Sequence, residues 1–299
     1  MLYFCEMGLE VKYVEAKSIL SKLKGADTFF GIAYNMNLYR GCQHGCIYCD
    51  TRSECYGIHD ISTVSVKKNA LKLLAKELPP KRKNRATIGT GSMNDPYMPL
   101  EKEIGLVRSA LQLIARERFP VHIITKSNLV ERDADILQDI AKVYAAVSFT
   151  ITSADDSLSQ QIEPLAPPSS KRFKAMEELA KKGIYTGVTL MPLLPFINDT
   201  VENITHIVQQ AKDAGASYII PMFGVTLRKG SREYFYQALD ERFAGCKERY
   251  QSYFGDQYMC NSPQYKVLTD MFMNLTAKLG LDMGMRFYEP PVYKQQTLF

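Results

Sequence analysis

The chain has 299 residues, of which 46% are apolar and 23% charged, so its composition is that of a globular protein and excludes a disordered or fibrous one. Its net charge of +5 permits an anionic substrate but does not require one. No apolar run approaches the roughly 18 residues of a membrane span, and the N-terminus lacks the pattern of a secretory signal. We therefore expect a cytoplasmic protein with no membrane partner.

Short apolar runs alternate with amphipathic stretches along most of the chain. The runs predict six strands, at 35–39, 85–90, 121–125, 145–152, 184–191 and 218–221. The stretches between them predict helices at 64–78, 104–114, 170–182 and 201–211. This order predicts a parallel sheet with helices outside it. Six units are too few for a closed eight-stranded barrel, so we expect an α/β fold, a partial (β/α)6 barrel of TIM type with an open side.

The pattern changes near residue 225. We expect an N-terminal extension at 1–30, the partial barrel at 31–224 and a helical C-terminal extension, or cap, at 225–299. Eight aromatic residues lie between positions 234 and 258 of this cap. One interpretation is helix packing against the barrel. The other is a cover over the barrel mouth, with one or two aromatic rings touching substrate.

Three of the seven cysteines lie close together, as Cys42, Cys46 and Cys49 in a C-x3-C-x2-C spacing. An odd number of cysteines in a cytosolic chain favours metal or thiol chemistry over disulfides. Three thiolates on a short loop can bind one metal centre. A four-iron cluster normally takes four cysteines, so with three one iron keeps an open coordination position. The alternatives are a structural zinc that also uses His44, and chance clustering. We interpret Cys55 as an ordinary loop thiol.

Tyr48 directly precedes the third cysteine, and C-x3-C-x-Y-C closely resembles the cluster motif of the radical S-adenosylmethionine (radical SAM) superfamily. The resemblance implies that Cys42, Cys46 and Cys49 bind a [4Fe-4S] cluster, and that S-adenosylmethionine (SAM) chelates the fourth iron. It also implies that reduction cleaves SAM to methionine and a 5′-deoxyadenosyl radical, which takes a hydrogen atom from the substrate. An external electron donor such as flavodoxin or ferredoxin is expected.

Further motifs follow the predicted strands, where parallel barrels carry their chemistry. They are D-P-Y-x-P-x-E from Asp95, E-P-x-A-P-x-x-x-x-R from Glu163 to Arg172, and P-x-x-P-x-x-N-D from Pro192 to Asp199. Together they resemble the spore-photolyase-like branch of the superfamily, often called "DNA repair photolyase".

This second resemblance implies how SAM is held. Its amino group would donate hydrogen bonds to Asn94 and Asp95, and its carboxylate would pair with Lys126 and Arg172. The ribose would bond to Thr150, and the adenine would meet Tyr48 and the backbone near Met191. Taken singly, each residue also has a purely structural interpretation: a turn at Asp95, a solvated loop charge at Lys126, an exposed helix face at Arg172.

Two departures from spore photolyase concern substrate chemistry. That enzyme has a hydrogen-donating cysteine in the loop after the second strand, whereas the matching stretch here, 92–95, has no thiol. It also has a tyrosine directly after the third cluster cysteine, where this chain has Asp50. The cofactor motifs therefore match better than the substrate motifs.

Two basic clusters have different expected positions. Lys81, Arg82, Lys83 and Arg85 precede the second strand, at the end of the barrel far from the site. Arg228, Lys229 and Arg232 follow the sixth strand, where they could line the mouth and suit a phosphate or carboxylate.

The preferred hypothesis is a radical SAM enzyme that abstracts hydrogen from an organic substrate. The substrate class stays open among a nucleic acid or nucleotide, a peptide and a small metabolite. The alternatives are a spore-photolyase-like lyase that repairs a DNA lesion, and a non-catalytic metal-binding interaction protein.

Overall fold

The computed structural model describes residues 2–4, 10–25, 27–58 and 60–290. Cys5 and the end of the expected cap, 291–299, lie outside the described residues. The strands are β1 (Leu2–Phe4), β2 (Glu10–Val14), β3 (Leu20–Lys22), β4 (Tyr34–Met36), β5 (Tyr39–Arg40), β6 (Val64–Lys67), β7 (Ile88–Thr90), β8 (Val121–Thr125), β9 (Ala145–Thr150), β10 (Tyr185–Leu190), β11 (Tyr218–Pro221), β12 (Gly224–Thr226) and β13 (Met259–Asn261).

The α-helices are α1 (Ala70–Glu77), α2 (Leu100–Ile104), α3 (Leu106–Arg116), α4 (Ala134–Ala141), α5 (Asp156–Ile162), α6 (Ser169–Lys181), α7 (Val201–Asp213), α8 (Ser231–Arg242), α9 (Cys246–Phe254) and α10 (Tyr265–Leu279). Short 3-10 helices are η1 (Asp50–Arg52), η2 (Glu54–Tyr56), η3 (Pro79–Asn84) and η4 (Asn128–Asp133).

A seven-stranded sheet forms the barrel, in the order β11-β10-β9-β8-β7-β4-β3. The six strands from β4 to β11 in this order are parallel, and β3 adds an antiparallel edge to β4. The end strands β11 and β3 do not pair with each other, so the barrel stays open. The predicted partial barrel with six parallel strands is confirmed.

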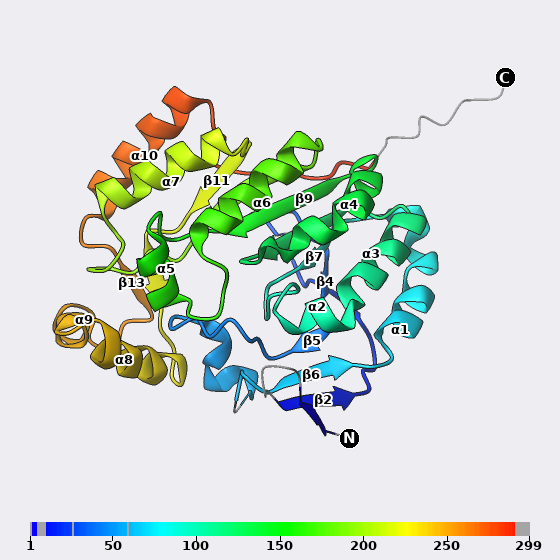
Figure 1. Ribbon diagram of the computed structural model, residues 1–299, viewed down its shortest axis with the longest axis horizontal. Coiled ribbons are helices and arrows are strands. Elements are labelled where there is room, and N and C mark those ends of the chain that lie inside the picture. The colour runs from blue at the N-terminus through cyan, green and yellow to red at the C-terminus, as the bar shows by residue number, and fades with distance from the viewer. Residues whose placement is uncertain (1, 5–9, 26, 59, 291–299) are drawn as a thin grey trace.

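Helices cover the outside of this sheet (Figure 1). In α3 the buried residues Val107, Ala110, Leu111 and Ile114 follow the spacing of one helix face. In α7 the buried residues are Ile204, Ile207, Val208 and Ala211, again on one face. The buried face of each helix supplies the apolar area that holds it against the strands.

The barrel interior is filled by side chains, and one glycine makes room for a ring. All six residues of β9 are buried. A Cβ on Gly187 of β10 would lie 2.4 Å from the ring of Tyr218 on the neighbouring strand. The Tyr218 hydroxyl is hydrogen-bonded to Ser148 Oγ at 2.7 Å. Because the ring crosses in front of β10, position 187 has no space for a side chain.

The predicted helix at 64–78 is wrong over its first residues. Val64–Lys67 forms strand β6, and the helix α1 begins only at Ala70. Strand β6 pairs with β2 and β5 in a separate sheet of order β1-β2-β6-β5. Val64 and Val66 are buried while Ser65 and Lys67 are half-exposed, which is the two-residue period of a strand. The predicted first strand, 35–39, is likewise split between β4 and β5, which belong to different sheets.

The C-terminal segment forms a second hydrophobic cluster with the cysteine loop. Figure 1 shows α8 and α9 together at one side of the molecule, next to the segment after β5. Phe235, Tyr250 and Phe254 are buried here, in one cluster with Ile47 of the cysteine loop. The aromatic residues of the cap thus support the cysteine loop by packing. None of the eight aromatic residues between 234 and 258 lines the cavity described below, within the part of the chain that the structure describes.

Helix α10 packs against α7, and the chain after it covers a strand edge. The Ile219 N–H donates to Asp282 O at 2.8 Å, and the Asp282 N–H donates to Ser217 O at 3.1 Å. These bonds occupy the free edge of β11, which would otherwise expose unpaired backbone groups. None of the helices formed by the described residues has the length and apolar character needed to cross a membrane.

Candidate active site

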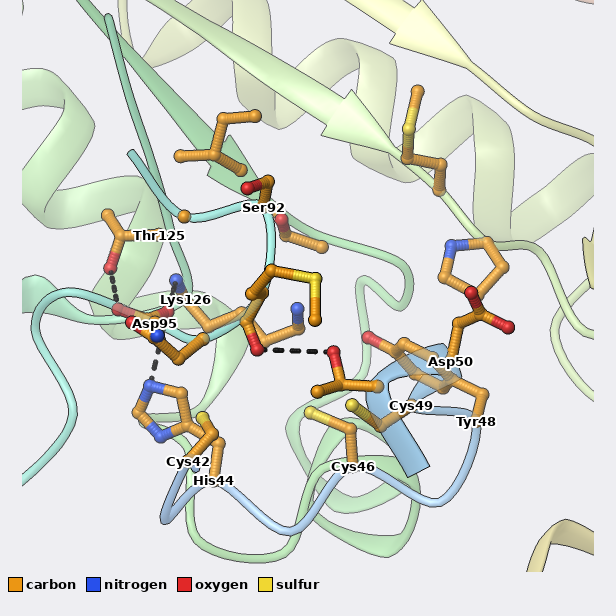
Figure 2. A pocket seen from close by; sticks show the side chains of 18 of the residues that line it. Cys42, His44, Cys46, Tyr48, Cys49, Asp50, Ser92, Asp95, Thr125 and Lys126 are labelled. Carbon is orange, nitrogen blue, oxygen red and sulfur yellow. Dashed lines mark hydrogen bonds and ion pairs between the residues drawn. The ribbon is translucent and has the colours of Figure 1, made fainter. Parts of the chain in front are cut away.

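A cavity of about 320 Å³ opens at the carboxyl ends of the barrel strands (Figure 2). Its size is in the range of small-molecule and cofactor sites. The predicted residues that line it are Cys42, Cys46, Tyr48, Cys49, Asn94, Asp95, Lys126, Thr150 and Met191. Residues from five segments of the chain thus meet at one place. Arg172 is the predicted site residue that does not line the cavity.

The three cysteines lie on one loop at the edge of this cavity, and Figure 2 shows all three side chains there. Burial raises the pKa of Cys42 to about 12, with a further contribution from the charge of Asp95. Burial also raises the pKa of Cys46 well above its usual value, against the lowering effect of Lys126. Buried thiols of this kind become good ligands when a metal supplies the positive charge that favours the thiolate.

The loop begins at a glycine that no other residue can replace without strain. Gly41 has φ +91°, and a Cβ there would lie 2.6 Å from the carbonyl oxygen of Thr63. The next residue, Cys42, donates its N–H to Ile61 O at 2.7 Å. The close approach of these two backbone segments therefore fixes the direction in which the loop leaves β5.

A buried ion pair supports the cysteine loop. Glu163 and Arg172 are almost completely buried, and Arg172 Nη1 lies 2.5 Å from Glu163 Oε2. The Tyr48 hydroxyl donates to the same carboxylate. Arg172 also donates to the carbonyl oxygens of Thr150 at 2.8 Å and Pro167 at 2.7 Å. Arg172 therefore joins the cysteine loop to the end of β9. Burial would raise the pKa of Glu163, but the positive charges of Arg172 and Lys126 hold it below its usual value.

Backbone hydrogen bonds connect the same two segments. The Ile47 N–H donates to Ile162 O at 2.9 Å, and the Leu165 N–H donates to His44 O at 3.0 Å. The E-P-x-A-P-x-x-x-x-R motif thus forms the support of the cysteine loop. Sequence reasoning gave Glu163 no role of its own. Its place in that motif was a signal, but nothing in the sequence pairs position 163 with position 48.

Asp95 braces three elements. Its Oδ1 accepts hydrogen bonds from Tyr97 N at 2.9 Å and Thr125 Oγ1 at 2.7 Å, and its Oδ2 accepts one from Lys126 N at 2.6 Å. His44 Nε2 lies 3.2 Å from Oδ2. Burial alone would raise the pKa of Asp95, but His44 and these hydrogen bonds lower it to about 2. The carboxylate thus holds the loop after β7 to the end of β8 and to the cysteine loop.

Lys126 brings a positive charge into the cavity from the end of β8. Its ammonium lies 5.7 Å from the centre of the Tyr48 ring. Within the described residues, the ammonium has no hydrogen bond or ion pair. Burial would lower its pKa, but the nearby Cys46 and Glu163 charges raise it, so Lys126 stays protonated. A half-buried cation of this kind is available to an anionic group of a ligand.

The remaining predicted residues also have protein partners. Asn94 lines the cavity and donates its Nδ2–H to Tyr39 O at 2.8 Å. Thr150 Oγ1 lies 2.9 Å from Thr189 Oγ1, where either hydroxyl can donate. Met191 lines the cavity together with Met222 and Val225.

The expected positive charges after the sixth strand are compensated. Arg228 Nε lies 3.6 Å from Asp50 Oδ1, and Lys229 Nζ lies 3.1 Å from Glu54 Oε2. Arg232 donates to the carbonyl oxygens of four residues, Leu227, Gly255, Asp256 and Gln257. Its expected place at the mouth is therefore wrong, because the guanidinium is used to hold the turn before β13. The other basic cluster precedes β7, as expected, and Arg82 there pairs with Glu117.

The other described cysteines do not reach the cavity. Cys55 is exposed, Cys246 is half-buried on α9, and Cys260 is fully buried on β13. Cys260 is the strand partner of Val225, which does line the cavity, but its own thiol lies 3.7 Å from Gln257 O. Among the described residues, the only thiols at the cavity are those of the C-x3-C-x2-C loop.

A comparison with protein-family models assigns the chain to a family. The model of the Radical SAM superfamily matches residues 36–220, which span the barrel strands and the cysteine loop. The chain belongs to the Radical SAM superfamily. The resemblance seen in the cysteine spacing is thereby confirmed, and this radical SAM protein is an enzyme.

Relatives and solved structures agree with this family. An uncharacterized protein of Mycobacterium tuberculosis is 29% identical over 235 residues, which cover 76% of this chain and 68% of the relative. An uncharacterized protein of Methanocaldococcus jannaschii is 29% identical over 240 residues, or 79% of this chain and 86% of the relative. The structure of spore photoproduct lyase complexed with dinucleoside spore photoproduct has a TM-score of 0.67, with 15% identity, and covers 91% of this chain and 81% of that chain. This last likeness confirms the fold of the radical SAM chain.

Proposed function

We propose that this radical SAM enzyme binds a [4Fe-4S] cluster through Cys42, Cys46 and Cys49, and uses it with SAM to abstract hydrogen from an organic substrate. The observation that carries the proposal is the meeting of these three thiols with the unpaired ammonium of Lys126 in one cavity. When bound, the cluster supplies the electron that cleaves SAM to methionine and a 5′-deoxyadenosyl radical, which removes a hydrogen atom from the substrate.

The donor set fits a cluster. In the described part of the chain, no three His, Cys, Asp or Glu side chains lie close enough to hold a single metal ion. The three thiols lie instead around one side of a cavity, which suits a cluster because each thiolate binds a different iron. A structural zinc with His44 would need its donors gathered on one point. His44 instead faces Asp95, at 3.2 Å.

The chain's own residues bind and orient SAM in this proposal. Lys126 pairs with the carboxylate, and Asn94 and Asp95 accept hydrogen bonds from the amino group. Thr150 bonds the ribose, while Tyr48 and the backbone near Met191 contact the adenine. Asp95 positions the backbone of Lys126 through its hydrogen bond to Lys126 N. Arg172 acts through Glu163 and the Thr150 carbonyl, since it lies outside the cavity lining.

The test of this proposal is anaerobic SAM cleavage. Protein reconstituted with iron and sulfide and reduced with dithionite should form 5′-deoxyadenosine from SAM, slowly without substrate. High-performance liquid chromatography measures the product. Protein that holds about four irons and never forms 5′-deoxyadenosine would contradict the proposed function. Protein purified anaerobically with stoichiometric zinc and no iron would contradict the cluster.

Lys126→Met should weaken SAM binding by tenfold or more, about 1.4 kcal/mol or above, because the SAM carboxylate would lose a charge-assisted contact in a half-buried site. Equilibrium binding of SAM to the reconstituted protein measures this. Lys102→Met is the matched control, because Lys102 is exposed and lies outside this cavity. Equal SAM affinity in Lys126→Met and wild type would show that the carboxylate binds elsewhere.

The substrate class is a separate question, and repair of a DNA lesion is the second candidate. A repair lyase of the spore-photolyase type returns a hydrogen atom to its product radical from a thiol. Ser92 lines the cavity here, and its O–H bond is too strong to serve as a good donor to a carbon radical. We therefore expect little or no conversion of dinucleoside spore photoproduct to thymidylyl-thymidine by the reduced enzyme with SAM. Multiple-turnover repair in an anaerobic assay would overturn this expectation.

The division into an N-terminal extension (1–30), a partial barrel (31–224) and a C-terminal cap (225–299) stays part of the proposal. Residues 20–22 of the first segment join the barrel sheet through β3, and β12 begins the last segment by pairing with β13. An odd number of cysteines and a reduced cluster both suit the reducing cytoplasm, where flavodoxin or ferredoxin would supply the electron.

A further inference from the structure

A second cavity, of about 470 Å³, lies beside the cysteine loop. We name it the His44–Leu165 groove; its walls come from Pro99 and Lys102 of the α2 region, residues 127–129, and residues 164–167 with Lys171. His44 lines both this groove and the candidate active site. The groove and the proposed SAM site therefore adjoin at His44 of the cysteine loop.

The groove contacts the cysteine loop directly between two of the cysteines. Leu165 N donates to His44 O at 3.0 Å, and His44 Nδ1 lies 3.4 Å from Leu165 O. A Cβ on Gly45 would lie 3.8 Å from the Pro164 side chain. A molecule seated in the groove would thus contact the loop between Cys42 and Cys46 at His44.

The charge of the groove is positive. Lys102 and Lys171 are exposed at its walls, and the lining residues include no aspartate or glutamate within the described part of the chain. Neither lysine forms an ion pair with another described residue. Next to Lys102 in sequence, Glu103 is exposed beyond the lining and Glu101 is buried and paired with Arg132. Glu163, which precedes Pro164, is buried and paired with Arg172. Positive charge that no protein group neutralises favours an acidic partner.

The groove also has apolar lining residues. Leu165 is 56% exposed, and Pro164, Pro167 and Leu129 line the groove with it. A small apolar contact with a charged rim is typical of transient redox complexes, which bury less surface than stable ones. The active-site cavity, in contrast, must hold SAM and substrate, so a protein partner has to approach the cysteine loop from elsewhere.

We propose that the His44–Leu165 groove is the docking site of an acidic, one-electron carrier protein of the flavodoxin or ferredoxin type. The proposal rests on the function proposed above. In the step, one electron leaves the carrier, which is oxidised, and enters the cluster, which is reduced. Lys102 and Lys171 attract the acidic surface of the carrier, and Leu165 forms the apolar contact.

The experiment compares two reductants on the reconstituted enzyme. We expect Lys102→Glu/Lys171→Glu to lower flavodoxin-supported 5′-deoxyadenosine formation at least tenfold, with the dithionite-supported rate within twofold of wild type. Small dithionite does not need the groove, whereas flavodoxin does. The matched control is Lys83→Glu/Lys182→Glu, which makes the same change in net charge on two exposed lysines that precede β7 and β10, at the far end of the barrel. The control should keep both rates.

Direct binding gives a second readout that does not need activity. Calorimetry with oxidised flavodoxin at low salt should show binding to wild type and to the control, weakened at least tenfold in Lys102→Glu/Lys171→Glu. Leu165→Asp should also weaken it. Equal flavodoxin binding and equal flavodoxin-supported rates in the groove variant and the control would overturn the proposal, as would no binding to wild type. A third outcome separates the two proposals. If dithionite gives no SAM cleavage but flavodoxin binding is still weaker in the groove variant than in wild type, the proposed function is contradicted and the docking site stays supported.

Discussion

Replacement of Cys42, Cys46 or Cys49 by alanine should reduce iron binding from about four atoms per chain to near zero and abolish 5′-deoxyadenosine formation. Each thiolate binds a different iron, and the loop offers no replacement, because no further thiol lines the cavity among the described residues. Iron and sulfide analysis, with the visible absorption of the reconstituted protein, measures the first effect. Chromatography of the SAM reaction measures the second.

Cys55→Ala and Cys246→Ala are the matched controls. Cys55 is exposed and Cys246 is half-buried, so neither change removes a core contact of the barrel. Both variants should bind iron as wild type does. Full iron content and SAM cleavage in Cys46→Ala, or loss of iron in Cys55→Ala, would show that the ligand set is wrong.

Glu163→Ala should lower the free energy of unfolding by about 3–5 kcal/mol, because it leaves the guanidinium of Arg172 buried without its carboxylate. The same change removes the acceptor of the Tyr48 hydroxyl, so the cysteine loop loses its support and iron retention should fall. Urea unfolding followed by circular dichroism measures the stability, and iron analysis after gel filtration measures retention.

Two variants separate the buried pair from its neighbours. Tyr48→Phe removes one hydrogen bond and should cost about 1 kcal/mol, since Arg172 keeps its partner. Glu177→Ala breaks an exposed pair with Lys181 on α6 and should change stability by less than about 1 kcal/mol. A Glu163→Ala protein as stable as the Glu177→Ala protein would contradict the supporting role of the buried pair.

The sequence by itself determined the features that depend on neighbours in the chain. The cysteine ligands are close in space because they are close in sequence, so their spacing was sufficient to find them. The parallel strands were found from short stretches rich in apolar residues, such as 145–152, where Val147 and Phe149 alternate with Ser148 and Thr150. The buried faces of α3 and α7 were found because apolar residues repeat there with the helical period. The open barrel followed from the number of these units.

Only the tertiary structure decided which charged side chains face the cavity. In the sequence, Lys126 and Arg172 were both candidates to pair with the SAM carboxylate, because each is a cationic residue in a segment that follows a predicted strand. The fold places Glu163 against Arg172, which neutralises the arginine, and gives Lys126 no such partner among the described residues. The same holds for Arg232, whose acceptors lie 23 to 25 residues away along the chain, apart from Leu227. Ion pairs and carbonyl contacts of this kind depend on distances between separate segments, and residue types along the chain do not record those distances.

Strand β6 shows the same limit for secondary structure. Residues 64–67 are compatible with the beginning of a helix, because Val66 and Ala70 have helical spacing. They form a strand because β2 and β5 offer hydrogen-bonding edges on both sides. The helical spacing was therefore overridden by strand partners more than 20 residues away, which only the folded chain brings together.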